Sequence, residues 1–125
     1  MVRPEDKSMV LPWALLILAP IFVCAVSGQL IPEGVERIPT HWDFNGNVNG
    51  WGSPSDVMGL GYIMAATNVL MAVLYFRTDS LFERGLVSAD SPQSARKVLV
   101  GTGVFLVVVT AIIQWVIVSS VLSNI

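Results

Sequence analysis

The stretch Val57–Phe76, VMGLGYIMAATNVLMAVLYF, indicates a transmembrane helix because its twenty residues include no Asp, Glu, Lys, Arg or His. A bilayer core about 30 Å thick needs roughly 20 apolar residues in a helix. Two further stretches, Met9–Gly28 and Val98–Leu122, also lack these residues and contain 20 and 25 residues. The sequence therefore predicts an all-α integral membrane protein with three transmembrane helices.

The composition of the 125-residue chain supports this interpretation. It is 54% hydrophobic and 13% charged, with a mean hydropathy of +0.68, whereas soluble domains carry about 25% charged residues. The length allows one domain at most. No cluster of basic residues points to nucleic acid, so the lipid bilayer is the first partner that we expect.

The first charge-free stretch is either a membrane anchor or a cleaved signal peptide. Ala25–Ser27 offers small residues for cleavage, but the apolar run exceeds the usual 7–15 residues of a signal peptide, so we expect a retained anchor. Pro20 near its centre predicts a kink that neighbouring helices cover. Trp13 is expected at a membrane interface, and Cys24, the only cysteine, is expected to be inert packing.

The basic residues indicate the orientation of the spans, because Lys and Arg near span ends stay on the cytoplasmic side. Six of the seven lie in segments 1–8 and 77–97, and only Arg37 lies in segment 29–56. The chain therefore divides into a cytoplasmic tail (1–8), a two-span module (9–76) with an external loop (29–56), a cytoplasmic loop (77–97), a third span (98–122) and an external tail (123–125).

Three local patterns mark helix boundaries. Ser53–Asp56, SPSD, provides a capping hydroxyl, a proline at the first helical position and a carboxylate in the first turn. Ser91–Ser94, SPQS, repeats the Ser-Pro start, so the third helix is expected to begin before the membrane. Between them, TDSLFERG predicts a short helix that Thr78 or Asp79 caps and Gly85 ends.

Small and polar residues form one stripe on each of the last two spans. In lipid, small residues let helices approach closely and buried amides join them, at about 0.6–2 kcal/mol for each hydrogen bond. We expect the two stripes to meet, with Asn68 and Gln114 bonding across or to backbone. The alternative is that both amides line a substrate path. The stripe residues are Gly61, Ala65, Asn68 and Ala72, and Gly103, Thr110 and Gln114.

The loop between the first two spans is expected to be an ordered hairpin. The stretch IPTHWDF has the alternating pattern of a strand and is followed by Asn45-Gly46. This pair is a strong hairpin signal because both residues tolerate positive φ. A second Asn-Gly pair, Asn49-Gly50, follows. Trp42 and Trp51 are expected either to stack together or to lie on the bilayer surface.

The same loop holds the only candidates for chemistry. His41 and Asp43 are two apart and would share a face of a strand, as half of a zinc site or an acid–base pair. A zinc site needs three or four ligands, and the chain has no second histidine. A calcium-binding loop of the EF-hand type would need Gly at position 48 and Glu at position 54, where this chain has Val48 and Pro54. We therefore predict no metal and no cofactor: His41 bonds loop backbone, Asp43 starts a turn, and the asparagines supply left-handed positions.

The stretch LIPEGVERIPTHWDFNGNVNGWGS resembles the bacterial membrane family named domain of unknown function 1648, over roughly residues 9–76. The family pattern is a Pro, then Ile-Pro-x-His-Phe/Trp, a Gly and a Trp before the next helix. The module also resembles the N-terminal part of SdpI-type immunity proteins. The resemblance implies a multi-pass protein of the bacterial cytoplasmic membrane and, by analogy, immunity to a secreted toxin. The matching residues are Pro32, Ile38, Pro39, His41, Trp42, Gly46 and Trp51.

These observations favour a non-enzymatic membrane module that binds a protein partner, or a second copy of itself, through the external loop and the helix faces. Its role would lie in immunity, signalling or assembly. The alternatives are an envelope metal-dependent enzyme or sensor built on His41 and Asp43, and an accessory subunit of a transporter. A carrier by itself is disfavoured because ion carriers place ionisable residues within the membrane, and the three spans hold none.

Overall fold

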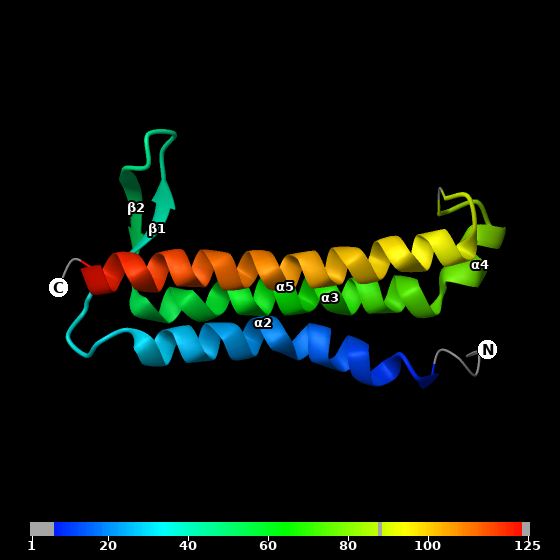
Figure 1. Cartoon of the computed structure of the whole chain (residues 1–125), viewed down its shortest axis with the longest axis horizontal. Helices are drawn as coiled ribbons and strands as arrows, with labels where there is room; N and C mark the ends of the chain where they lie inside the picture. The colour runs from blue at the N-terminus through cyan, green and yellow to red at the C-terminus, as the bar shows by residue number, and fades with distance from the viewer. Residues whose placement is uncertain (1–6, 88, 124–125) are drawn as a thin grey trace.

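Three long helices lie side by side in the computed structural model, which describes residues 7–87 and 89–123. They are α2 (Val10–Leu30), α3 (Val57–Phe76) and α5 (Pro92–Ser123), and each pair is in contact (Figure 1). All three are long and apolar enough to cross a membrane. The predicted three-span fold is confirmed, with a small β-hairpin added between α2 and α3.

The hairpin comprises β1 (Ile38–Trp42) and β2 (Val48–Gly52), and it lies beside the C-terminal part of α5. Figure 1 shows that it runs across the bundle rather than along it, with its tip clear of the helices. The short helix α4 (Thr78–Glu83) lies at the opposite end of the bundle, near the start of α5. We call these two ends the hairpin end and the α4 end.

The start of α3 follows the Ser-Pro pattern in the sequence. A 3₁₀ turn, η1 (Pro54–Asp56), leads directly into the helix. The Ser53 backbone N–H donates to Asp56 Oδ2 at 2.9 Å, and the Asp56 N–H donates to the Ser53 carbonyl at 2.9 Å. These bonds satisfy two backbone N–H groups, which would otherwise lack a hydrogen-bond partner at the start of a helix.

The start of α5 repeats this device, because the Ser94 N–H donates to Ser91 Oγ at 3.1 Å. At 1.5 Å per residue the 32 residues of α5 extend about 48 Å, well beyond a 30 Å bilayer core. The helix begins at Pro92, before the charge-free stretch Val98–Leu122, as the Ser-Pro pattern predicts. In this extension the Arg96 guanidinium contacts Asp79 Oδ1 of α4 at 2.5 Å.

The cap predicted for α4 is wrong. Residue Thr78 lies within the helix, and its hydroxyl donates back to the carbonyls of Leu74 and Tyr75, at 2.8 Å each. The residue that precedes the helix is Arg77, so α4 follows α3 almost without interruption. The predicted end is confirmed: Gly85 has a φ of +71°, which closes the helix in the left-handed conformation that suits glycine.

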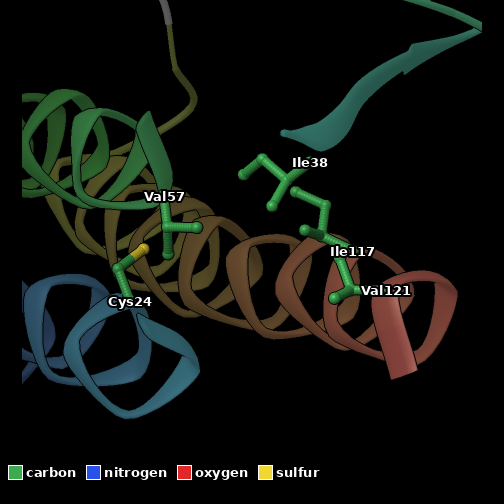
Figure 2. Close-up of a cluster of buried hydrophobic side chains, with 5 residues drawn as sticks. All are labelled: Cys24, Ile38, Val57, Ile117 and Val121. Carbon is green, nitrogen blue, oxygen red and sulfur yellow. The ribbon is translucent and has the colours of Figure 1, made fainter. Parts of the chain in front are cut away.

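Two buried clusters hold the bundle together. At the hairpin end, Ile38 of β1 lies over α5, and the cluster extends to α3 and α2 (Figure 2). Its members are Cys24, Ile38, Val57, Ile117 and Val121. At the α4 end the cluster contains Trp13, Ala72 and Tyr75. Trp13 is 1% exposed, and its ring packs 5.5 Å from the ring of Tyr75, so it is part of the core at this end of the bundle. Its depth in the membrane stays a prediction.

Candidate functional site

The polar centre of the bundle forms around a backbone carbonyl that a proline leaves without a hydrogen-bond donor. Pro20 lies inside α2 and has no N–H, so the carbonyl of Leu16, four residues earlier, lacks its helical donor. Asn68 Nδ2 donates to this carbonyl oxygen at 2.8 Å and reaches the carbonyl oxygen of Gly103 at 3.4 Å. One fully buried amide therefore connects α3 to both α2 and α5.

Glycines on the two stripes allow close approach to α2. A Cβ at Gly61 would lie 2.9 Å from the Pro20 carbonyl oxygen and 3.0 Å from Cys24 Sγ. A Cβ at Gly103 would lie 3.1 Å from the Trp13 ring. Both glycines therefore pack on α2, and the contact between Asn68 Nδ2 and the Gly103 carbonyl oxygen joins the two stripes. The remaining small stripe residues, Ala65 and Ala72, are also buried.

The polar residues further along α5 are buried but do not join Asn68. The Thr110 hydroxyl donates to the Leu106 carbonyl of its own helix at 2.7 Å. Gln114 is 2% exposed, and its Oε1 has no hydrogen-bond partner among residues 7–87 and 89–123. The Asn68 amide nitrogen thus bonds to backbone, whereas the side-chain oxygens of both Asn68 and Gln114 lack a partner in the described chain.

The hairpin turn is built around Asp43 and Gly46. Asp43 Oδ1 accepts the N–H groups of Asn45 and Asn47, at 2.9 Å each, and the Asp43 N–H donates to the Asn47 carbonyl at 2.9 Å. The Gly46 N–H donates to the Asp43 carbonyl at 3.1 Å, and Gly46 has a φ of +83°. This is a three-residue hairpin loop with glycine in the left-handed position.

The turn confirms the hairpin signal at Asn45-Gly46 and the role of Asp43. The expectation that the asparagines take left-handed positions is wrong. Among the described residues, positive φ occurs only at glycines, including Gly46 in this turn. The Asp43 side chain already satisfies the amides of Asn45 and Asn47, so these residues keep ordinary backbone conformations.

His41 projects from the exposed side of β1 and pairs across the hairpin. Its Nδ1 lies 2.5 Å from the side-chain oxygen of Asn49, so the predicted bond to loop backbone is wrong. Gly50 is the residue opposite His41 in the strand register, and a Cβ at Gly50 would lie 2.9 Å from the His41 Cβ. The second Asn-Gly pair is therefore not a turn: Asn49 holds the imidazole and Gly50 makes room for it.

The two hairpin tryptophans have different surroundings. Trp42 is half-buried and packs against the cluster that contains Ile38. Trp51 pairs with Pro39 in the register, is 51% exposed, and has the Arg37 guanidinium carbon 5.3 Å from its ring centre. A cation over an aromatic face is attracted by the ring quadrupole. Each indole thus has its own packing environment, which differs from the first of the two expected arrangements, a stacked pair. The second, a position on the bilayer surface, stays a prediction.

The remaining motif residues shape the base of the hairpin. Ile38 and Pro39 are buried at its base. Pro32 is half-buried, and its carbonyl accepts the Val35 N–H at 3.4 Å in a turn where Gly34 has a φ of +88°. At the opposite end of the hairpin Phe44 is fully exposed. The hairpin is therefore an anchored arm with an aromatic side chain at its tip.

The described residues do not surround His41 with further metal ligands. Across residues 7–87 and 89–123, no three His, Cys, Asp or Glu side chains are grouped so as to hold a metal ion. The carboxylate of Asp43 is engaged by two backbone amides of the turn. The imidazole faces the amide of Asn49, a neutral group. This geometry gives His41 a partner that holds its orientation.

The fold defines a small multi-pass membrane protein with an ordered hairpin between its first two spans. Residues 15–65 match the model of the family described as Domain of unknown function (DUF1648), which confirms the resemblance over this segment. The matched segment contains most of α2, the whole hairpin and the first half of α3. No curated protein and no solved structure matches the chain.

Proposed function

We propose that the protein is a non-enzymatic membrane module that binds a protein partner through the hairpin, outside the cytoplasmic membrane. The observation that carries the proposal is the fully exposed side chain of Phe44 at the tip of an anchored hairpin. Large aromatic residues are enriched among the residues that dominate binding energy at protein interfaces. An ordered arm also loses less conformational entropy on binding than a flexible loop does.

The construction of the hairpin supports this role. Its base is fixed to α5 through Ile38, which is completely buried with Ile117 and Val121. Its turn is closed by the four hydrogen bonds around Asp43. At the base of the hairpin, opposite Pro39, the partly exposed Trp51 adds a second aromatic surface with Arg37 over its ring. The arm therefore presents aromatic side chains in fixed positions.

The proposed orientation places the hairpin end outside the cell. Lys7, Arg77, Arg84, Arg96 and Lys97 belong to segments at the α4 end, and only Arg37 belongs to the hairpin end. Basic residues near span ends are retained in the cytoplasm. The distribution therefore supports a cytoplasmic α4 end in a bacterial plasma membrane, with the hairpin and the end of α5 on the outer side.

The surroundings of His41 favour binding over catalysis. A general base needs a group that positions it and a substrate position within hydrogen-bond reach. Asn49 orients the imidazole through Nδ1, but the Asp43 carboxylate serves the turn and not the imidazole. We infer that these polar residues stiffen the arm. The metal-dependent enzyme or sensor considered from the sequence gains no support from this arrangement.

A narrower version of the proposal is toxin immunity or signalling, which rests on the resemblance to SdpI-type immunity proteins. In that version the hairpin contacts a secreted toxin or a membrane-bound partner at the outer surface. The position of the hairpin at one end of the bundle is compatible with this version (Figure 1). The resemblance to the immunity proteins is the only support for choosing this class of partner.

Photo-crosslinking tests the proposal in living cells. A photoreactive phenylalanine analogue at Phe44 is expected to give one discrete protein adduct after irradiation. The same analogue at Phe105, an exposed residue within the α5 span, serves as the matched control and is expected to give lipid adducts. Adducts limited to lipid at both positions would contradict the proposal.

A further inference from the structure

A cavity of about 390 Å³ lies between the hairpin and the end of α5. Its walls include Pro39 and Trp51 of the hairpin and Ser120 and Val121 of α5. Arg37, which directly precedes β1, also lines it. A basic side chain therefore faces a space between the hairpin and a membrane span.

The cavity lies where the apolar part of the span ends. The charge-free stretch Val98–Leu122 has 25 residues, which extend about 37 Å as a helix. Ser120 and Val121 belong to its last turn, and α2 ends at the same end of the bundle (Figure 1). Because a bilayer core is only about 30 Å thick, we expect this last turn, and the cavity beside it, at the level of the lipid headgroups.

The guanidinium of Arg37 is available to an anion. It makes no ion pair with Glu36 or with any other described residue. Its contact with the ring of Trp51 involves no acceptor atom, so its N–H groups can still donate hydrogen bonds. Among the described residues that line the cavity, none is acidic. A guanidinium matches the paired oxygen atoms of a phosphate group.

The remaining walls are apolar and identify the rest of the ligand. They consist of the side chains of Val35, Pro39, Val48 and Val121. A free phosphate ion would leave this apolar surface exposed to water. A phospholipid carries a phosphate and acyl chains in one molecule, and its phosphate lies at the level expected for the cavity. The combination of one cation with apolar walls therefore favours a phospholipid.

We propose that this cavity binds a phospholipid from the leaflet at the hairpin end. Arg37 donates hydrogen bonds to the phosphate oxygens, and the first part of an acyl chain covers Val48 and Val121. The bound lipid connects the hairpin to α5, in addition to the contact that Ile38 makes. The site involves neither Phe44 nor a protein partner, so it stands or falls independently of the function proposed above.

The indole N–H resonance of Trp51 reports binding to the full chain in micelles of a non-ionic detergent. The chain has four tryptophans, and Trp51→Phe assigns the resonance. Titration with dioctanoyl phosphatidylglycerol should shift it to saturation, whereas the resonance of the buried Trp13 should stay in place. Arg37→Gln should weaken binding about 5-fold. The matched control is Arg84→Gln, which removes an exposed basic side chain at the α4 end and should leave binding at Trp51 unchanged.

Two further ligands separate the phosphate from the chains. Dioctanoylglycerol has the chains without the phosphate, and inorganic phosphate has the anion without the chains. Both should bind more weakly than dioctanoyl phosphatidylglycerol. Equal binding of dioctanoylglycerol would show a purely apolar cavity, and equal binding of inorganic phosphate would show a site for a free anion. Either result would overturn the proposal, as would a Trp51 resonance that does not respond to the phospholipid.

A second variant keeps the test decisive if Arg37→Gln opens the hairpin. Hydrogen exchange of the Asp43 amide, which bonds Asn47 across the turn, shows whether the hairpin stays closed. Val48→Ser retains Arg37 and its contact with Trp51 but makes one wall polar, so it should weaken phospholipid binding about 2- to 5-fold. Wild-type affinity in Val48→Ser, or in a closed Arg37→Gln variant, would contradict the proposed site.

Discussion

The side-chain amide of Asn68 donates a 2.8 Å hydrogen bond to the carbonyl oxygen of Leu16, the group that Pro20 leaves without a helical donor. Fifty-two residues separate Asn68 and Leu16 in the chain. The contact explains how a proline is accommodated within the first span: the second span supplies the donor that the first has lost. We therefore regard Asn68 and Pro20 as one structural unit.

Replacement of Asn68 tests this unit. Asn68→Leu is close in size but cannot donate, so we expect it to lower the free energy of unfolding by about 1–2 kcal/mol. Steric-trapping or denaturation measurements in mixed micelles give this value. Thr67→Ala is the matched control, because the Thr67 hydroxyl bonds only to Ile63 of its own helix. A control effect as large as that of Asn68→Leu would contradict the assignment.

A second substitution tests the link with the proline. Pro20→Ala restores an N–H to position 20, which gives the Leu16 carbonyl its helical donor again. In that background, Asn68→Leu should cost less than about 0.5 kcal/mol, because only the longer contact to Gly103 is then lost. The double-mutant cycle in unfolding free energy measures the coupling. Additive effects of the two substitutions would show that Asn68 does not serve the proline.

The close contact between α2 and α3 leads to a prediction for Gly61. Gly61→Ala places a methyl group against the Pro20 carbonyl, a backbone atom that cannot rotate away. We expect a loss of about 1–3 kcal/mol, typical of overpacking. Gly59→Ala, in the same helix, meets nothing within 4 Å and should be neutral or stabilise by up to about 1 kcal/mol. Equal unfolding midpoints for the two variants would refute the contact.

The hairpin turn requires left-handed backbone at Gly46 and not at Asn45. An alanine at Gly46 must adopt a φ near +83°, at a cost of about 1–2 kcal/mol. Asn45→Ala should change stability by less than about 0.5 kcal/mol. Hydrogen exchange of the Asp43 amide, which bonds Asn47 across the turn, reports closure of the hairpin. Faster exchange in Asn45→Ala than in Gly46→Ala would be evidence against this turn.

The sequence predicts the elements of this fold well because their signals are local. Charge-free stretches identify spans, Ser-Pro pairs mark the starts of α3 and α5, and Asn45-Gly46 marks the hairpin. These patterns depend on membrane thickness and on backbone conformation within a few residues. They need no knowledge of which helix faces which neighbour.

The contacts between elements are harder to predict because they depend on how each helix is rotated about its axis. The sequence suggests that the amides of Asn68 and Gln114 join the last two spans, yet Asn68 serves α2 as well and Gln114 keeps an open acceptor. Tryptophan is a residue type that favours membrane interfaces, yet the side chain of Trp13 is buried among the helices. Asn49 carries no sequence signal as a partner of His41, because strand register alone brings the two together.

The side of the membrane on which the hairpin lies can be measured by cysteine labelling. The wild-type chain, whose only cysteine is buried, should not react with a membrane-impermeant maleimide and serves as the blank. Asn47→Cys, at the exposed turn, should react in intact cells, whereas Ser80→Cys in α4 should react only after the membrane is opened. Reaction of Asn47→Cys only after lysis would place the hairpin in the cytoplasm and exclude a partner outside the membrane.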